Sequence, residues 1–207
     1  MKKLFTILTV VALTTTISFA QPQFGGVFGF NSSAIGSSND NGYAMEDGRM
    51  GICIGGTAHF PLGDIMQLRT GMTYSQKGAS ETFGGVTTTL KLDYLEIPID
   101  FAFMLGDGGF ALSGGPYIAF AMNKSISTDP SADPLTQAFM DAMADELIGG
   151  MDFGLNFGAS YTIGETYMIG AKYGMGLMDI LDEPTGSPEE TWVNGSFSVS
   201  FSYMFGG

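Results

Sequence analysis

The sequence predicts an all-β fold, a closed antiparallel up-and-down transmembrane β-barrel of about eight strands. Apolar residues alternate with small or polar residues along most of the chain, which is the periodicity of strands. Beyond the N-terminal leader no apolar run reaches 18 residues, so a helical membrane protein is excluded. The chain has 31 Gly, 17 Phe and 8 Tyr, a mixture that suits small residues inside a barrel and aromatic residues outside it.

Residues 1–20 have the pattern of a secretory signal peptide. Lys2 and Lys3 give a positive start, a mostly apolar stretch follows, and Ser18-Phe19-Ala20 supplies the small-x-small cleavage pattern. The apolar stretch is too short to span a bilayer as a helix. We therefore expect cleavage near Ala20 and a mature outer-membrane β-barrel domain over residues 21–207.

The mature chain is strongly acidic. Without the two leader lysines, six basic residues stand against 21 acidic ones, a formal charge of −15. This charge argues against nucleic acid as a partner, because nucleic-acid binding needs a basic surface. The acidic residues gather in residues 39–47, 129–146 and 179–190, which predicts solvated acidic loops.

The clearest alternation lies at the C-terminus. From Val193 to Phe205 one face is apolar or aromatic and the other is mostly serine, as expected for lipid outside a barrel and a polar lumen inside. The same reasoning along the chain predicts eight strands, at Phe24–Phe30, Arg49–Phe60, Ile65–Lys77, Thr88–Leu105, Gly109–Asn123, Gly150–Ile163, Thr166–Met178 and Val193–Phe205.

Short and long connections alternate between these strands. Residues 61–64, 106–108 and 164–165 are short and rich in turn-forming residues. The long, polar connections are residues 31–48, 78–87, 124–149 and 179–192. Every long loop would then lie at one end of the barrel, as in outer-membrane proteins with short periplasmic turns and long extracellular loops.

Four stretches resemble the PorT-like outer-membrane β-barrel proteins of Bacteroidetes. They follow in order along the chain as LDYLEIPI (92–99), GGPY (114–117), MDFG (151–154) and YGMGLMDI (173–180). The resemblance spans essentially the whole mature chain and implies an eight-stranded barrel embedded in outer-membrane lipid. The family's founding member is associated with protein secretion, but most members have no assigned activity. The resemblance therefore implies no catalytic residues and assigns no secretion role.

The chain lacks the residues that an enzyme site would need. Hydrolysis or acyl transfer needs a nucleophile, a base and an orienting group close together. His59 is the only histidine, and it is expected inside the barrel at the periplasmic end, far from the long loops. The only cysteine, Cys53, is also expected to face inward, and the two together lack two of the four ligands of a zinc site. We predict no catalytic, cofactor or metal site.

Charged residues on inward positions predict a network that closes the lumen. Arg69 and Asp100 should lie at a similar height on neighbouring strands, with Glu96 further along and Lys172 near Asp152. Unpaired buried charges cost several kcal/mol, so in a narrow lumen these groups should pair; the alternative is that trapped water hydrates each one separately.

The third long loop predicts a helix. Asp133 can cap it, Pro134 suits its first position, and an apolar stripe recurs every fourth residue, at Leu135, Phe139, Met143 and Leu147. The stripe could pack on the barrel mouth as a lid. Alternatively, it could be an exposed surface that binds another protein or a lipid-like ligand.

These observations favour a non-enzymatic outer-membrane protein that acts in envelope structure, in adhesion or in a larger assembly such as a secretion system. Its expected partners are outer-membrane lipid and other envelope proteins that its loops contact. The alternative is a soluble extracytoplasmic β-barrel that binds a small apolar ligand, which would need an apolar lumen. An outer-membrane acyl hydrolase or transferase would need a histidine near the long loops.

Overall fold

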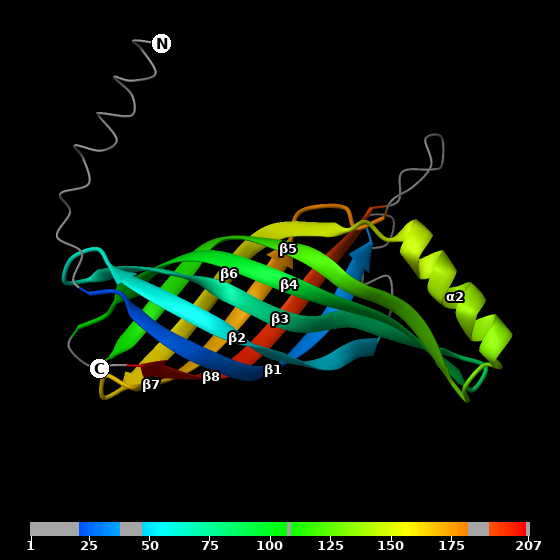
Figure 1. Ribbon diagram of the computed structural model, residues 1–207, viewed down its shortest axis with the longest axis horizontal. Helices are drawn as coiled ribbons and strands as arrows, with labels where there is room; N and C mark the ends of the chain where they lie inside the picture. The colour runs from blue at the N-terminus through cyan, green and yellow to red at the C-terminus, as the bar shows by residue number, and fades with distance from the viewer. Residues whose placement is uncertain (1–20, 38–46, 107–108, 182–190, 206–207) are drawn as a thin grey trace, which may run out of the picture.

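The computed structural model describes residues 21–37, 47–106, 109–181 and 191–205 of the 207, so the leader and its cleavage site lie outside the described residues. Eight strands form one closed barrel in chain order, with one helix outside it (Figure 1). Within the described ranges no helix is long and apolar enough to cross a membrane. The elements are β1 Gln23–Ser37, β2 Asp47–Pro61, β3 Met66–Phe83, β4 Val86–Met104, β5 Phe110–Asp129, α2 Pro134–Leu147, β6 Met151–Ile163, β7 Tyr167–Gly176 and β8 Trp192–Phe205.

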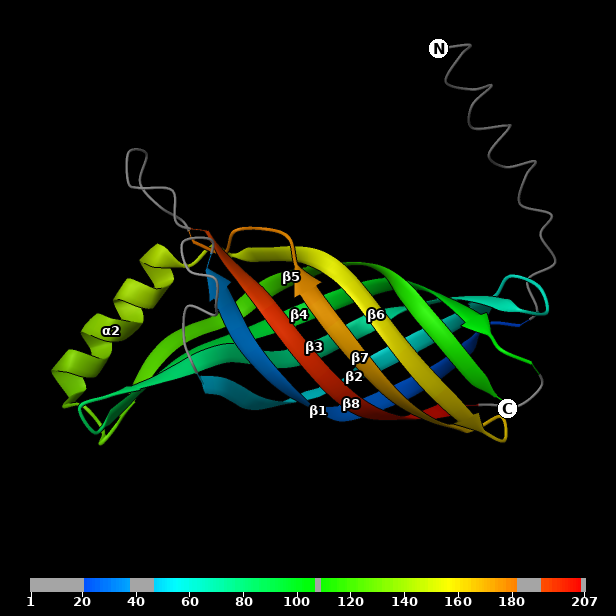
Figure 2. The ribbon, with the colours of Figure 1, turned by 180° about the vertical axis from the view of Figure 1, so that it is seen from behind.

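The barrel closes where the first strand meets the last. β1 pairs antiparallel with β8 from Phe24 opposite Phe205 to Ser37 opposite Trp192, and every other strand pairs with its chain neighbours (Figure 2). Closure leaves the membrane-spanning part without a sheet edge, and this is the condition under which strands can cross lipid. The predicted fold class is confirmed.

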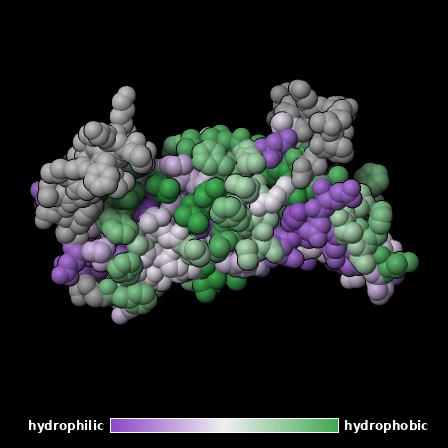
Figure 3. All heavy atoms as spheres, turned by 45° about the horizontal axis from the view of Figure 1, so that its top comes forward, coloured by the Kyte–Doolittle hydropathy of each residue, from purple (hydrophilic) through white to green (hydrophobic). Residues whose placement is uncertain are grey.

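Side chains alternate between the two faces of the barrel wall along most of each strand. In β8, Phe197, Val199 and Phe201 are exposed on the outside, whereas Asn194 and Ser202 are buried inside. The exterior of the barrel is broadly apolar (Figure 3).

The two ends of the barrel differ. The short connections lie at the end where β1 begins and β8 stops, which we call the turn end; the opposite end is the loop end (Figure 1). Aromatic rings cluster on the outside near the turn end, with centroid distances of 5.8 Å from Tyr167 to Phe201 and 5.6 Å from Tyr203 to both Tyr167 and Phe205. Such a girdle is typical of the interface between lipid and water.

The prediction of a long loop over residues 78–87 is wrong. β3 and β4 continue into a tight hairpin whose turn is Gly84-Gly85, with φ angles of +60° and +83°. Two residues with positive φ make the turn that matches strand twist, and glycine adopts it without strain. Hydroxyl groups form hydrogen bonds across the hairpin. The Ser80 and Thr89 hydroxyl oxygens are 3.0 Å apart, and those of Thr82 and Thr87 are 2.9 Å apart.

Three strands extend beyond the barrel at the loop end. β5 runs to Asp129, although its pairing with β6 stops at Phe120, and its last residues pair only with β4. α2 lies along this extension (Figures 1 and 2). We call the hairpin tip (80–89), the end of β5 (124–129) and α2 together the platform.

The facing of β8 can be tested by substitution. Val199→Arg should lower the free energy of unfolding by about 2–4 kcal/mol, because it places a charge on the outer face in mid-strand. The neighbouring Ser198→Asn should be nearly neutral, because Ser198 faces a polar part of the lumen. Urea unfolding of the folded barrel in lipid vesicles measures both. A larger effect at Ser198 than at Val199 would contradict the assigned faces.

Candidate functional site

The interior of the barrel divides into three layers along its axis. The layer at the loop end is apolar. Its residues are almost completely buried and come from four strands and two connections, namely Ile35, Ala79, Leu90, Leu92, Tyr94, Tyr117, Ala119, Ile148 and Ile180. We expected a polar lumen throughout, and for this layer that expectation is wrong. Because the layer is packed with the protein's own side chains, it leaves no room for an apolar ligand.

Two connecting segments close the mouth above this layer. Ile148 follows α2 and Ile180 follows β7, and both side chains point into the apolar layer. The Gly149 amide donates to the Ile180 carbonyl at 2.7 Å, and the Ile180 amide donates to the Trp192 carbonyl at 2.8 Å. The lid of the barrel is therefore made by these segments.

Lys77 is the centre of the second, charged layer. Its Nζ lies 2.8 Å from Glu96 Oε2 and 3.7 Å from Asp152 Oδ2, and all three side chains are at least nine-tenths buried. The ammonium group also lies over the ring of Tyr117, 4.6 Å from its centroid, where a cation is favoured. Lys172 adds a second cation, 3.1 Å from Glu96 Oε1.

Neutral groups also contact Asp152 through one of its two carboxylate oxygens, while the other, Oδ1, is buried without a hydrogen-bond partner. Its Oδ2 accepts hydrogen bonds from the Tyr117 hydroxyl and from Asn194 Nδ2, each at 3.0 Å. Gly154, opposite Tyr117 on β6, makes this possible, because a Cβ there would lie 2.6 Å from the tyrosine ring. The charged layer is thus a connected set of ion pairs and hydrogen bonds across the lumen.

Three of the five predicted charges lie in this layer, with partners other than those expected. Lys172 pairs with Glu96 rather than Asp152, because the β6–β7 register sets Lys172 opposite Gly158. Sequence reasoning missed Lys77, because the third strand was expected to end there. The signal was present: Lys77 is eight residues after Arg69, so both face inward along one strand.

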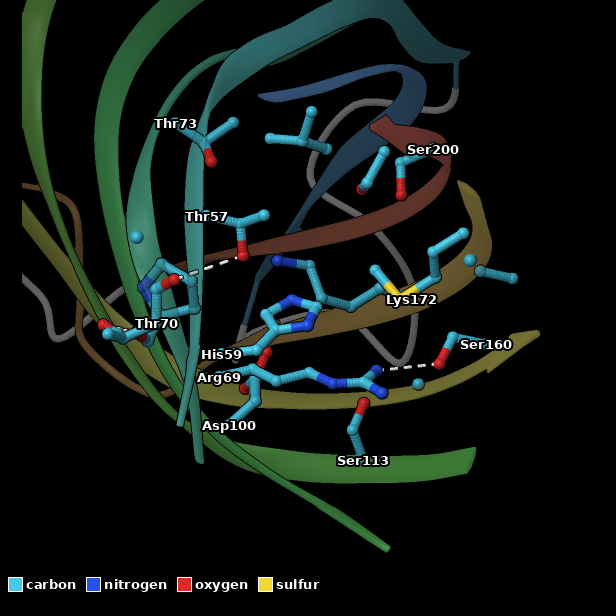
Figure 4. A pocket seen from close by; sticks show the side chains of 18 of the residues that line it. Thr57, His59, Arg69, Thr70, Thr73, Asp100, Ser113, Ser160, Lys172 and Ser200 are labelled. Carbon is cyan, nitrogen blue, oxygen red and sulfur yellow. Dashed lines mark hydrogen bonds between the residues drawn. The ribbon is translucent and has the colours of Figure 1, made fainter. Parts of the chain in front are cut away.

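The third layer, toward the turn end, is a polar cavity of about 120 Å³ (Figure 4). Arg69 and Asp100 are directly opposite on β3 and β4, as expected, but no ion pair joins them. The Arg69 guanidinium instead donates to Ser160 at 2.8 Å and to Gln67 at 3.3 Å. The expected Arg69–Asp100 pair is therefore wrong, since hydroxyl and amide groups lie nearer to the guanidinium.

Asp100 and His59 border this cavity with polar atoms that have no protein partner. Asp100 Oδ1 and His59 Nε2 are both buried. A polar cavity of this size accommodates a few water molecules, which can hydrate such atoms. His59 and Cys53 both face inward. Across the described part of the chain, no three His, Cys, Asp or Glu residues are placed to bind a metal ion.

The predicted helix in the third long loop is present as α2, and Asp133 caps it. The Asp133 carboxylate accepts from the amides of Leu135 and Thr136 and from the Thr136 hydroxyl. The hydrogen bonds from Thr136 lower the pKa of Asp133 below its usual value. Because the ionised form makes the cap, the cap is present above the ordinary carboxyl pKa and is lost as falling pH protonates Asp133.

α2 turns its polar face toward β5. Asp141 Oδ1 accepts from the Ile126 amide at 3.3 Å, and Gln137 Nε2 donates to the Ile126 carbonyl at 2.5 Å. Lys124 Nζ donates to the carbonyls of Asp145 and Ile148 at the helix C-terminus, each at 2.8 Å. The helix thus satisfies the backbone of a strand that β6 no longer covers.

This orientation leaves the apolar stripe facing away from the protein. Leu135 is 81% exposed, Phe139 64%, Met143 39% and Leu147 40%. The interpretation of the stripe as a lid is therefore wrong, because the helix packs its polar face against the free edge of β5 and its apolar stripe points away.

Comparison with known proteins identifies a family and a fold. Residues 19–182 match the family model described as outer membrane protein beta-barrel domain. Neisserial surface protein A is similar in structure, with a TM-score of 0.55 and 14% identity over 90% of this chain and 100% of that one. Ail, the attachment invasion locus protein of Yersinia pestis, is also similar in structure, with a TM-score of 0.50 and 12% identity over 90% of this chain and 100% of that one. Comparison with curated proteins gave no match.

Removing the central cation should strongly destabilise the barrel. Lys77→Met leaves two buried carboxylates short of positive charge, so the free energy of unfolding should fall by about 3–5 kcal/mol. The double variant Lys77→Met with Asp152→Asn should recover part of the loss. Urea unfolding in lipid vesicles measures each.

The matched control is Lys91→Met, on the opposite face of the wall, which should change the free energy of unfolding by about 0.5 kcal/mol or less. Arg69→Ala should lower the free energy of unfolding less than Lys77→Met does, because Arg69 forms no ion pair with Asp100, the carboxylate opposite it on β4. Equal losses at Lys77 and Lys91 would rule out the charged layer as a stabilising network.

Proposed function

Because the chain belongs to the family of outer membrane protein β-barrel domains, we propose that it is a non-enzymatic scaffold whose sealed barrel holds a binding platform outside the cell. The observation that carries this proposal is the filled lumen. An apolar layer and a charged layer occupy it in succession, and their residues are nearly all buried. A barrel filled in this way serves as an anchor rather than a diffusion pore.

We propose that the loop end is extracellular. The connections at the turn end are short, whereas the strand ends that flank the acidic segments 39–47, 129–146 and 179–190 lie at the loop end; residues 39–46 and 182–190 themselves are outside the described residues. Outer-membrane barrels of bacteria place short turns in the periplasm and long loops outside. With cleavage of the leader near Ala20, the mature protein is one barrel domain of residues 21–207.

We further propose that the chain is a PorT-like member of its family from Bacteroidetes, on the strength of the YLEIP stretch at residues 94–98. Its role is then in adhesion, in envelope structure or as one component of a larger assembly such as a secretion system. The platform is the part that fits this role, because its apolar stripe is exposed where a partner can reach it.

The soluble alternative fits the molecule less well. A carrier of a small apolar ligand needs an apolar cavity and a water-compatible exterior. Here the apolar layer is packed solid, and every strand carries at least one exposed large apolar side chain on the exterior. Examples are Phe28, Ile54, Met72, Ile99, Leu112, Phe157, Ile169 and Phe201. Apolar exposure of this extent marks a surface that contacts lipid.

Because its lumen is sealed, the barrel should not conduct ions. Wild-type protein in planar lipid bilayers should show little steady conductance, because the ion pairs of Lys77 and Lys172 with Glu96 and Asp152 lie across the lumen beneath the packed apolar layer. Lys77→Ala should produce more frequent openings than Lys91→Ala, the control on the opposite face of the wall. Large, stable channels from the wild type would overturn the scaffold proposal in favour of a pore.

A binding platform predicts contact with another envelope protein in living cells. A photo-crosslinking residue in place of Phe139 should yield a discrete covalent adduct containing a second protein. The same residue in place of Phe28, which is exposed on the barrel wall, should give none. Absence of a protein adduct at position 139, with the barrel correctly inserted, would argue that the platform has no protein partner.

A further inference from the structure

The stripe on α2 is held rigidly, so it is a formed surface rather than a loose loop. Polar groups on the opposite side of the helix fix it to β5, Asp133 caps its start and Lys124 binds its last carbonyls. From Leu135 to Leu147 the stripe is about 18 Å long at 1.5 Å per residue. Apolar side chains at every fourth position form the contact line of a helix that packs on another helix.

The exposed charge around the stripe is acidic. Among the described residues of the platform, every fully exposed charged side chain is acidic, namely Glu81, Asp129, Asp133, Asp145 and Glu146. Lys124 is partly buried against the end of α2, where its Nζ lies 3.7 Å from Asp145 Oδ1, and Lys91, just beyond the hairpin tip, is also partly buried. The Asp145 side chain is nevertheless 71% exposed, and the neighbouring Glu146 is also exposed. Figure 3 shows hydrophilic and hydrophobic residues side by side at this end of the molecule.

This charge distinguishes between the possible occupants. A second copy of the chain would bring Asp145 and Glu146 against the same carboxylates, which costs free energy. Lipids of the outer leaflet would present phosphates, which the carboxylates also repel. A partner with basic residues beside an apolar face gains from both the stripe and its acidic border.

We propose that the α2 stripe docks a cationic amphipathic helix of a partner protein. The apolar side of that helix packs on Leu135, Phe139, Met143 and Leu147, and its lysines or arginines lie beside Asp145 and Glu146. This inference rests on the proposed function of the platform and specifies the chemistry of its partner.

Defined peptides test this directly. The full-length protein is placed in nanodiscs of zwitterionic lipid, with empty nanodiscs as the background. The probe is a fluorescent helical peptide of leucine and lysine, about five turns long, with leucine on one face. It should bind about tenfold or more tightly than the same peptide with glutamate in place of lysine, and added salt should weaken it.

Variants locate the binding. Leu135→Asn with Phe139→Asn should weaken the cationic peptide about tenfold, since both side chains are exposed and their loss leaves the fold intact. Phe83→Asn is the matched control, an even more exposed phenylalanine on the hairpin tip outside the stripe, and should have no effect. Asp145→Asn with Glu146→Gln should weaken the cationic peptide several-fold and strengthen the glutamate peptide. Circular dichroism shows that each variant retains its β content.

Three results would overturn the inference. The first is equal binding of the lysine and glutamate peptides. The second is binding that the stripe variants leave unchanged. The third is self-association or binding to anionic vesicles that requires Phe139, which would assign the stripe to a second copy or to lipid. A protein adduct at position 139 in cells without any preference for the lysine peptide would refute the cationic partner and leave the platform function intact.

Discussion

The constraint that shapes this molecule is that every backbone amide and carbonyl inside lipid must find a partner within the protein. A sheet meets it only by closing on itself, which the β1–β8 ladder does over fourteen residue pairs from Phe24 to Ser37. Closure with eight strands makes the lumen narrow, and a narrow lumen has to be filled. This need to fill a narrow lumen explains the packed inner side chains and the buried ion pairs. It also explains why the described residues form no wide pore.

The same constraint acts differently outside the barrel. β5 continues nine residues past its last pair with β6, so one edge of its extension has no strand beside it. α2 covers that edge with Asp141 and Gln137, which bind the Ile126 amide and carbonyl. Because an amphipathic helix has only one polar face, covering the edge with that face leaves the apolar face in water. The exposed stripe is therefore a consequence of how the β5 edge is satisfied.

Inside the barrel, apolar packing forms one layer of the lumen and ion pairs form the next. Glu96 accepts from both Lys77 and Lys172, and Asp152 shares Lys77 with two neutral donors. Burying charged groups is unfavourable unless they are paired, so the contacts of this charged layer favour one arrangement of the six strands, β3 to β8, that supply them. The apolar layer above it excludes water from the loop end, and the polar cavity below admits it from the turn end.

The sequence by itself determined the barrel, its strand order, the facing of the clearly alternating strands such as β6, β7 and β8, and the α2 cap, because a two-residue period and a capping motif are local properties of the chain. It also placed Arg69, Glu96, Asp100, Asp152 and Lys172 on inner positions. Only the tertiary structure decided which of these charges meet, since pairing depends on the register between strands far apart in the chain, as with Lys172 and Glu96 across the lumen. It likewise decided that Lys77 is central, because this depends on which inner charges lie near it across the lumen, and that the α2 stripe faces outward, because this depends on how far β5 continues past β6.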